Sequence, residues 1–412
     1  MQMAAFQLIS NLAGFPRKRF WWLGKRILTH DRALEGMLLG STAAGVVASI
    51  VVARSIGPAG RGAVVTLTVW AQLLGWLATL SLDKAVVVLA TGRDAVPSAE
   101  EALHAARRIV VGTSCLAAAA SLLLGSRFFT SAVLVLALAT MAVATVQWEL
   151  IGGYLLASGR RPAFIAWKAL QPALYLTILV CVAILMRGAD IQLRTDIMGI
   201  GASASIAIPV VFTLVAFRGP LTAAGRGFIQ LLRFAATAHL GTILQYLNGR
   251  LDLLALSFLV GPASLGLYSV GAALGQLSLL TANAGVLRGM TGEAKRTDFV
   301  GLAFAGLIAT LVIVAAPFVI PLVFGKSFVA AVSIARILAI GGVVNYALQG
   351  ACGRLLGRRQ PWMVVLSQAI GVVVFVIGIA IFRTLEGVAS SSVISFLVSL
   401  LVAHAALRLD ER

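Results

Sequence analysis

Charged and amide side chains gather in one apolar stretch, residues 234–260, where hydrophobic neighbours would surround them. A charge in the middle of a bilayer costs roughly 2.5–3.5 kcal/mol on insertion scales, so such groups usually face a cavity or a polar partner. On a helix that turns about 100° per residue they form two stripes. The first stripe contains His239, Thr242, Tyr246 and Arg250, and the second contains Gln245, Asn248 and Asp252. This segment is predicted to be polar on two sides.

Two kinds of chemistry fit these stripes. Arg250, with Tyr246 beside it, is suited to hold an anionic substrate, whereas Asp252 and Asn248 suit the binding of a cation or a proton. The alternative is that the same groups hydrogen-bond to neighbouring helices, which is a common use of polar residues in membrane bundles. The sequence alone leaves both interpretations open.

Isolated polar groups in other apolar stretches are further candidates for the same pathway. Glu149 is a candidate for ion coupling, and Arg336 and Gln276 are candidates for substrate binding. Glu149 and Arg336 could instead pair with each other or extend to the membrane interface. Gln276 lies on a stripe with Ser269 and Asn283 that would line either a helix contact or a pathway.

The elements that must position these residues are transmembrane helices. Hydrophobic residues make up 60% of the 412 and charged residues only 12%, and the mean hydropathy is +0.98. Runs long enough to cross a hydrocarbon core of about 30 Å recur along the chain, with short connections and no room for a soluble domain. The chain is therefore predicted to be an all-α, polytopic membrane protein with about twelve spans. These are residues 34–53, 63–82, 108–126, 129–150, 163–186, 196–217, 234–260, 263–287, 299–324, 328–352, 361–382 and 386–407.

The positions of the basic residues predict the orientation of these spans. The net charge is +18, and most of the 33 Lys and Arg residues lie on the side that holds both termini. The positive-inside rule makes this side cytoplasmic. Residues 1–33 combine basic and aromatic side chains and are predicted to lie along the cytoplasmic interface, in contact with membrane lipids, without a cleavable signal. The basic residues are scattered singly at helix ends, so no nucleic-acid partner is expected.

An internal repeat divides the spans into two groups of six. Equivalent spans point the same way, which indicates a parallel repeat about an axis along the membrane normal. Gly57-Pro58-Ala59, Gly62 and Gln72 recur as Gly261-Pro262-Ala263, Gly266 and Gln276. The predicted organisation is an N-lobe at 34–217, a cytoplasmic loop at 218–233, a C-lobe at 234–407 and a cytoplasmic tail at 408–412.

The cysteines and the remaining histidines indicate no further chemistry. Cys115, Cys181 and Cys352 have no paired spacing, and His104 and His404 have no partners at ligand spacing. We expect no disulfide framework, no metal site and no cofactor. No catalytic residue is indicated, and the chain is not expected to be an enzyme.

Three stretches, taken in their order along the chain, resemble the oligosaccharide flippases. These are polysaccharide-biosynthesis membrane proteins in a superfamily that also contains multidrug and lipid II exporters. The stretches are Arg54-Ser-Ile-Gly-Pro-Ala-Gly-Arg-Gly62, then Asn248-Gly-Arg-Leu-Asp-Leu-Leu254 running on to Val260-Gly-Pro-Ala-Ser-Leu-Gly-Leu-Tyr268, and Phe324-Gly-Lys-Ser-Phe328.

The resemblance implies two lobes arranged in a V and alternating access in a bacterial inner membrane. It implies a substrate of polyprenyl diphosphate carrying an oligosaccharide, moved to the outer leaflet for surface or exopolysaccharide synthesis. Protons or sodium would drive transport, and polysaccharide polymerase machinery is a candidate partner. The eleventh span departs from cation-coupled relatives, because it offers Ser367 and Gln368 but no carboxylate. This argues against a sodium site between the seventh and eleventh spans.

Two other functions are compatible with parts of the sequence. A multidrug exporter of the same fold class would prefer acidic residues in its cavity, whereas Arg250 and Arg336 are basic. A membrane-embedded polysaccharide polymerase or ligase would need a sizeable outer loop, and all predicted outer loops are short. Both functions are retained as alternatives to the flippase.

Overall fold

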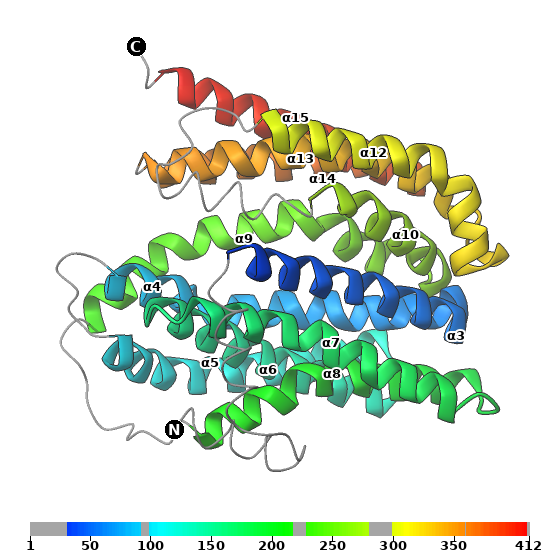
Figure 1. Ribbon diagram of the computed structural model, residues 1–412, viewed down its shortest axis with the longest axis horizontal. Helices are drawn as coiled ribbons and strands as arrows, with labels where there is room; N and C mark the ends of the chain where they lie inside the picture. Colours follow the sequence, from blue (N-terminus) through cyan, green and yellow to red (C-terminus); the bar gives the residue numbers. More distant parts are fainter. Residues whose placement is uncertain (1–30, 92–98, 217–227, 280–298, 359, 410–412) are drawn as a thin grey trace.

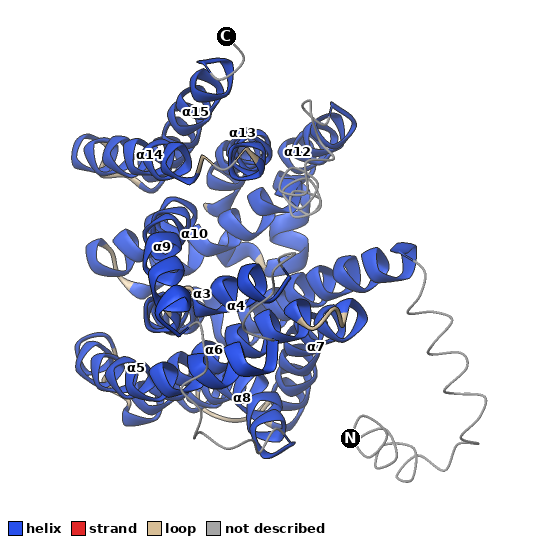
Figure 2. Cartoon of the chain, turned by 90° about the vertical axis from the view of Figure 1, so that its left-hand side faces the viewer, coloured by secondary structure: helices blue, strands red, loops and turns tan. Residues whose placement is uncertain are grey.

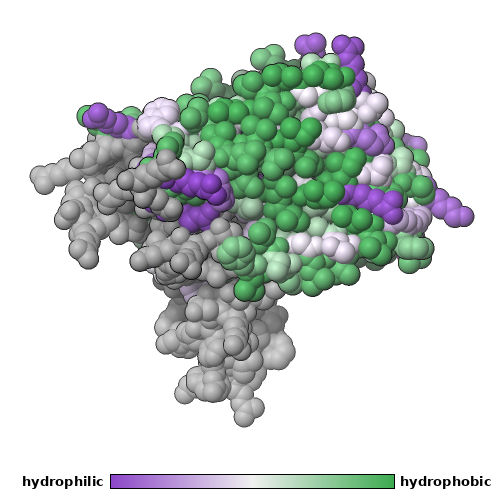
Figure 3. All heavy atoms as spheres, turned by 90° about the horizontal axis from the view of Figure 1, so that it is seen from above, coloured by the Kyte–Doolittle hydropathy of each residue, from purple (hydrophilic) through white to green (hydrophobic). Residues whose placement is uncertain are grey.

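The helices of this protein lie side by side along one axis (Figure 1). The computed structural model describes residues 31–91, 99–216, 228–279, 299–358 and 360–409, and within these ranges every regular element is a helix. Apolar side chains cover much of the face in Figure 3, with polar groups toward its edges. In the described ranges, nine helical segments are long and apolar enough to cross a membrane. The predicted all-α membrane fold is confirmed.

The first six predicted spans lie in α3 and in α5 to α8, and the short helix α4 follows the second span. The helix α3 covers the first two spans, and the predicted amphipathic segment 1–33 lies outside the described residues except for the start of this helix. The elements are α3 (Asp31–Thr79), α4 (Leu82–Thr91), α5 (Ala99–Phe128), α6 (Ala132–Ala157), α7 (Arg161–Leu185) and α8 (Ile191–Ala216).

The last six predicted spans correspond to α9 through α15. The helix α9 begins at Phe228, so the end of the predicted loop 218–233 is helical. Its polar stripes lower its hydropathy, and it is not among the nine apolar segments. The elements are α9 (Phe228–Leu259), α10 (Pro262–Gly275), η1 (Gln276–Leu279), α12 (Phe299–Val319), the π-helix η2 (Ile320–Phe324), η3 (Lys326–Phe328), α13 (Ala331–Gly357), α14 (Pro361–Ile381) and α15 (Leu385–Leu409).

A sharp kink at Gly57 divides α3 into two halves. Gly57 has φ 66° and ψ −171°, a conformation that residues with a Cβ rarely adopt. Pro58 follows and has no N–H to donate to the preceding turn. The chain therefore reverses its course with almost no loop, and each half corresponds to one predicted span.

The helices pack into two lobes that meet in the middle of the molecule (Figures 1 and 2). The N-lobe is α3 to α8, with a core in which α6 contacts α3, α4, α5 and α8. The C-lobe is α9 to α15, where α13 packs on α10, α12 and α15. The lobes meet where α3 and α4 contact α9 and α10. This two-lobe arrangement agrees with the parallel repeat predicted from the sequence.

The two Gly-Pro turns of the repeat pack directly against each other. A Cβ added to Gly62 would lie 1.8 Å from the carbonyl oxygen of Pro262, and one added to Gly266 would lie 1.9 Å from that of Pro58. Each lobe thus presents a glycine to the backbone of the other, in a reciprocal pair. We call this end of the bundle the turn end, and the opposite end, where α3 meets α4, the α4 end.

Replacing Gly62 by alanine is expected to force the lobes apart at the turn end. The added methyl group would overlap a backbone carbonyl, which cannot rotate away, and overpacking of this kind typically costs about 1–3 kcal/mol. Spin labels on Ala59 and Ala263, exposed equivalents in the two turns, report the separation by double electron–electron resonance. Gly62→Ala should lengthen this distance by several ångströms.

Gly306→Ala is the matched control, because no atom lies within 4 Å of the position of its added Cβ. This variant should leave the distance between the labels unchanged. An unchanged distance in Gly62→Ala would contradict the close approach of the two turns.

Candidate functional site

A cavity of about 570 Å³ lies between the two lobes. The N-lobe lines it with residues of α3, α6, α7 and α8, and the C-lobe with residues of α9, α10 and η1. Its size falls in the range of roughly 300–1,000 Å³ that is usual for ligand sites. Among the residues that the structure describes, its lining includes two arginines, Arg61 and Arg250, and no Asp or Glu. We call this space the central cavity.

The polar stripes of the repeat converge on the central cavity. Gln72 and Gln276, equivalent positions of the two lobes, both line it. Thr68, one turn before Gln72, and Ser269, two turns before Gln276, also line it. These polar residues of the second and eighth spans thus face the space between the lobes. Gln276, one of the predicted substrate-binding residues, is among them.

Arg250 lines the cavity from α9 and is half-buried. In the part of the chain that the structure describes, its guanidinium forms no hydrogen bond or ion pair. A guanidinium has five N–H donors and retains its charge, so Arg250 can bind an anion through more than one hydrogen bond. Of the seven predicted site residues, Arg250 and Gln276 are the two that line the central cavity.

Arg61 is the second arginine of the cavity, and it differs from Arg250 because its donors are engaged. It is 5% exposed. Its Nε donates to Ser269 Oγ at 2.8 Å, across the lobe interface, and one terminal nitrogen donates to the carbonyl of Ser49 at 2.7 Å. Arg61 therefore joins both halves of α3 to α10. Arg61 lies between the predicted spans 34–53 and 63–82, so hydropathy gave no sign that it faces a cavity.

The helix α7 adds two polar residues that sequence reasoning missed. Gln171 and Tyr175 lie one helical turn apart and line the cavity on either side of Pro172, which also lines it. A proline and a glutamine in the middle of an apolar span were the available signal. They show that α7 contributes to the polar surface of the cavity.

Tyr246 fills the seam between α9 and the second half of α3. Its hydroxyl donates to the carbonyl of Val69 at 2.9 Å, and its ring lies 4.7 Å from that of Trp76. Further along the seam, Trp70 Nε1 donates to Ser257 Oγ at 3.0 Å. This seam joins the lobes beside the central cavity, and Tyr246 is not among the cavity's lining residues.

Asn248 faces the interior of the C-lobe. Its amide donates to Gln368 Oε1 at 2.6 Å and accepts from Ser395 Oγ at 2.6 Å. Gln368 belongs to α14 and Ser395 to α15, so Asn248 ties α9 to two helices. The position of Asn248 on the second predicted stripe is thereby explained by contacts within one lobe.

Asp252 also lies inside the C-lobe. Its carboxylate accepts from the Tyr268 hydroxyl at 2.8 Å and from the Leu253 backbone N–H at 2.8 Å. Asp252 and Arg250 form no ion pair in the described structure, as expected for residues two apart on a helix. The coupling roles of Asn248 and Asp252 stay predictions. No group of three or more His, Cys, Asp or Glu side chains suited to a metal occurs among the described residues.

Arg336 lies on α13, exposed and away from the central cavity. Its Nε donates to the carbonyl of Ile313 at 3.0 Å. Pro317 of α12 has no N–H, so this carbonyl lacks the helical partner four residues later. Arg336 supplies the missing donor, and its role toward a substrate stays a prediction.

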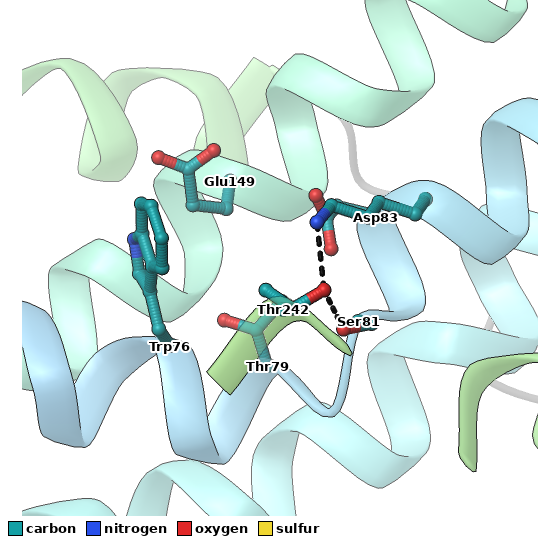
Figure 4. A pocket seen from close by; sticks show the side chains of 7 residues that line it. Trp76, Thr79, Ser81, Asp83, Glu149 and Thr242 are labelled. Atoms are coloured by element: carbon teal, nitrogen blue, oxygen red, sulfur yellow. Dashed lines mark hydrogen bonds between the residues drawn. The ribbon is translucent and has the colours of Figure 1, made fainter. Parts of the chain in front are cut away.

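Glu149 lies in a second, smaller cavity toward the α4 end, of about 110 Å³ (Figure 4). Its carboxylate accepts from Lys168 Nζ of α7 at 2.7 Å. Asp83 and Lys84 of α4 line the same cavity, together with Thr242 of α9. We call this space the charged cavity. The alternative in which Glu149 pairs with Arg336 is wrong, because Glu149 pairs with Lys168.

Comparisons with known proteins identify the fold. No protein-family model matches the chain, and no curated protein matches it. Solved structures do match. An inward-facing multidrug resistance MATE family transporter of the MOP superfamily aligns with a TM-score of 0.69 and 14% identity, over 90% of this chain and 94% of that one.

A second match is the lipid II flippase MurJ in an inward closed conformation. It has a TM-score of 0.67 and 11% identity, over 92% of this chain and 88% of that one. An outward-facing MATE family transporter aligns with a TM-score of 0.58 and 14% identity, over 94% of this chain and 96% of that one. At these identities the similarity shows the fold, which is that of MATE transporters and MurJ. The fold expected from the resemblance to flippases and exporters is confirmed.

The two cavity arginines are expected to differ in their effect on stability. Arg61→Gln removes hydrogen bonds that join the lobes and should lower the free energy of unfolding by about 1–2 kcal/mol. Arg250→Gln removes no hydrogen bond within the described structure and should leave stability nearly unchanged. Thermal unfolding of both variants in the same detergent tests this contrast. Equal destabilisation by the two substitutions would contradict it.

Proposed function

We propose that this protein moves a polyprenyl-diphosphate-linked oligosaccharide from the cytoplasmic to the outer leaflet by alternating access of its two lobes. The observation that carries this proposal is a ligand-sized cavity between the lobes whose described lining residues include two arginines and no carboxylate. Such a cavity suits an anion that is rich in hydroxyl groups.

The positive charge of the central cavity would lower the main energetic barrier to this transport. A diphosphate and its sugars lose their hydration in hydrocarbon, and this costs far more than thermal energy supplies. Arg250 is available for charge-assisted hydrogen bonds to phosphate oxygens, which are about twice as strong as neutral ones. Gln72 and Gln276 offer amide donors and acceptors to sugar hydroxyls from the two lobes.

The polyprenyl chain would remain in lipid, beside the first half of α3. Gly45 and Ser49 of this half line the cavity, and so do Gln276 and Leu277 of the C-lobe. Open space lies beside Gly45, where no atom comes within 4 Å of an added Cβ. On the other side of the cavity, Tyr246 and its neighbours fill the seam between the lobes. The chain would therefore leave the cavity past the first half of α3.

The orientation follows from the positive-inside rule, which assigns the turn end to the outer face of a bacterial inner membrane. The lobes are in contact at the turn end, through Gly62 and Gly266. We propose that separation of the lobes at the α4 end admits substrate from the cytoplasmic leaflet, and that separation of the two turns releases it outside.

Energy for the cycle would come from protons or sodium. Glu149 is half-buried in the charged cavity, and Asp252 is buried in the C-lobe, where Asn248 accompanies it one turn away. We propose Glu149 and Asp252 as coupling carboxylates, with Asn248 supporting Asp252. Asp252→Asn retains the size of the side chain, so a loss of ion-gradient dependence in this variant would identify the carboxylate as the coupling group.

Two alternative functions make different demands on the site. An exporter of small cations would need carboxylates in the cavity, and none occurs in the part of its lining that the structure describes. A polymerase or ligase would need a large outer domain, but the described connections at the turn end have only a few residues each. The solved structures with this fold are described as transporters and a flippase.

Arg250→Gln is expected to reduce transport of the lipid-linked oligosaccharide. Loss of charge-assisted hydrogen bonds worth roughly 1.5–3 kcal/mol corresponds to a rate or affinity lower by about 10- to 100-fold. The measurement uses proteoliposomes with a fluorescent polyprenyl-diphosphate oligosaccharide. Its movement is followed by quenching the fluorophores that are in the outer leaflet.

Arg127→Gln is the matched control, because this arginine is exposed at the turn end and does not line the cavity. It should transport normally. Wild-type protein that moves cationic dyes but not the lipid-linked sugar would refute the proposed substrate and favour a drug exporter. Normal transport by Arg250→Gln would refute the role of this arginine.

A further inference from the structure

The joint between α3 and α4 holds two residues in a conformation that favours glycine. Leu80 has φ 52° and Ser81 has φ 55°. A left-handed conformation is unfavourable for a residue with a side chain. The joint therefore persists because contacts around it hold it, and a loss of those contacts would release it. It places Asp83 and Lys84 in the first turn of α4, just beyond the apolar segment that ends at Thr79.

A glycine of α6 brings Asp83 close to Glu149. A Cβ added to Gly153 would lie 2.6 Å from the backbone carbonyl oxygen of Asp83, so only glycine admits this approach. Glu149 precedes Gly153 by one helical turn and faces the same side. Two carboxyl groups, from different helices, consequently line the charged cavity (Figure 4).

Hydrogen bonds to Thr242 of α9 join this region to the C-lobe. Lys84 Nζ donates to Thr242 Oγ1 at 2.6 Å, and Ser81 Oγ donates to the same oxygen at 3.0 Å (Figure 4). We call these two bonds the Thr242 bridge. They connect the lobes at the α4 end and hold the strained joint at the same time.

The ammonium group of Lys84 is directed to Thr242 of the other lobe and not to the carboxyl group of Asp83. Within the described residues Asp83 forms no ion pair, whereas Glu149 is paired with Lys168. An ionised Asp83 would attract the ammonium group of Lys84, which it adjoins in the sequence. The observed direction of Lys84 is the one expected when Asp83 carries no charge.

The surroundings of Asp83 favour its uncharged form. Removal from water raises the pKa of Asp83 above the usual value; Lys84 opposes part of this rise, and Glu149 adds to it. The other titratable groups near the cavity are Lys168 of α7 and His239 of α9, whose Nδ1 lies 3.4 Å from Ser81 Oγ. The helix α5 also packs on α4 but contributes no lining residue.

We propose that Asp83 is a proton-binding site that controls whether Lys84 bridges the two lobes. With a proton on Asp83, Lys84 donates to Thr242 and the lobes are joined at the α4 end. When Asp83 loses this proton to water, its carboxylate attracts Lys84, the Thr242 bridge loses its charged donor, and the strained joint is released.

The pH dependence of the Thr242 bridge follows from the number of protons that each state binds. The bridged state binds one more proton than the released state, so low pH favours the bridge. Raising the pH through the elevated pKa of Asp83 weakens the bridge. This inference deepens the proposed transport cycle, in which the lobes move relative to each other, and it identifies a coupling group beside Glu149.

The test measures the distance between the lobes at the α4 end without any substrate. Spin labels are attached to cysteines at Arg108 of α5 and Ile229 of α9, both exposed, after Cys115, Cys181 and Cys352 have been replaced by alanine. Distances in lipid nanodiscs are recorded by double electron–electron resonance between pH 5 and pH 9. Monodisperse elution and helical circular dichroism establish that each variant is folded.

In the wild-type chain the short-distance population should decrease as the pH rises. Asp83→Asn, which resembles the protonated acid in size and charge, should retain the short distance across the range. Thr242→Val, which removes the acceptor, should give the longer distance at every pH. Asp190→Asn, a carboxylate at the turn end, is the matched control and should titrate like the wild type.

Two results would overturn the proposal. One is titration of Asp83→Asn with the wild-type midpoint, which would assign the proton to another group. The other is an unchanged distance distribution in Thr242→Val, which would show that the bridge does not hold the lobes. Because no substrate is present, either result is independent of the flipping assay, and a chain that carries another substrate could still pass this test.

Discussion

The backbone of a membrane protein must satisfy its own hydrogen bonds, and this constraint shapes the whole molecule. Glycine and proline break helices here, and each break leaves carbonyl groups without their usual partners. Arginines supply donors to such carbonyl groups. Arg194 bonds to the carbonyl of Ser55 beside the kink in α3, and Arg336 bonds to that of Ile313 on α12. The positions of these two arginines are thus explained by backbone chemistry.

The polar groups within the membrane segments divide into those that hydrogen-bond to the protein and those that remain available to a ligand. Asn248 and Asp252 are bonded within the C-lobe, and Tyr246 is bonded across the seam. Arg250 has no such engagement in the described structure and faces the central cavity. A half-buried charge without a protein partner is costly within a membrane, and the proposed anionic substrate would supply that partner.

The fold was predictable from the sequence because its signals are local. Hydropathy located the helices, and the Gly-Pro turns revealed the repeat. The site was only partly predictable. Helical periodicity indicated that α9 is polar on two sides, but it could not say which side faces the other lobe. Arg61 was missed because its distance from Ser269 depends on how the lobes pack. The meeting of Asp83 with Glu149 depends on the room left by Gly153 and has no signature in either segment alone.

Where the two turns meet, Gly62 and Gly266 each lie against a backbone carbonyl of the other lobe. Neither glycine is among the residues that line the central cavity. Substitutions at Gln72, Gln276 or Gln171 can alter the cavity surface while the two turns keep their fit. Substrate range can consequently diverge during evolution without a change in the contact between the turns, and one scaffold can serve chemically different cargoes.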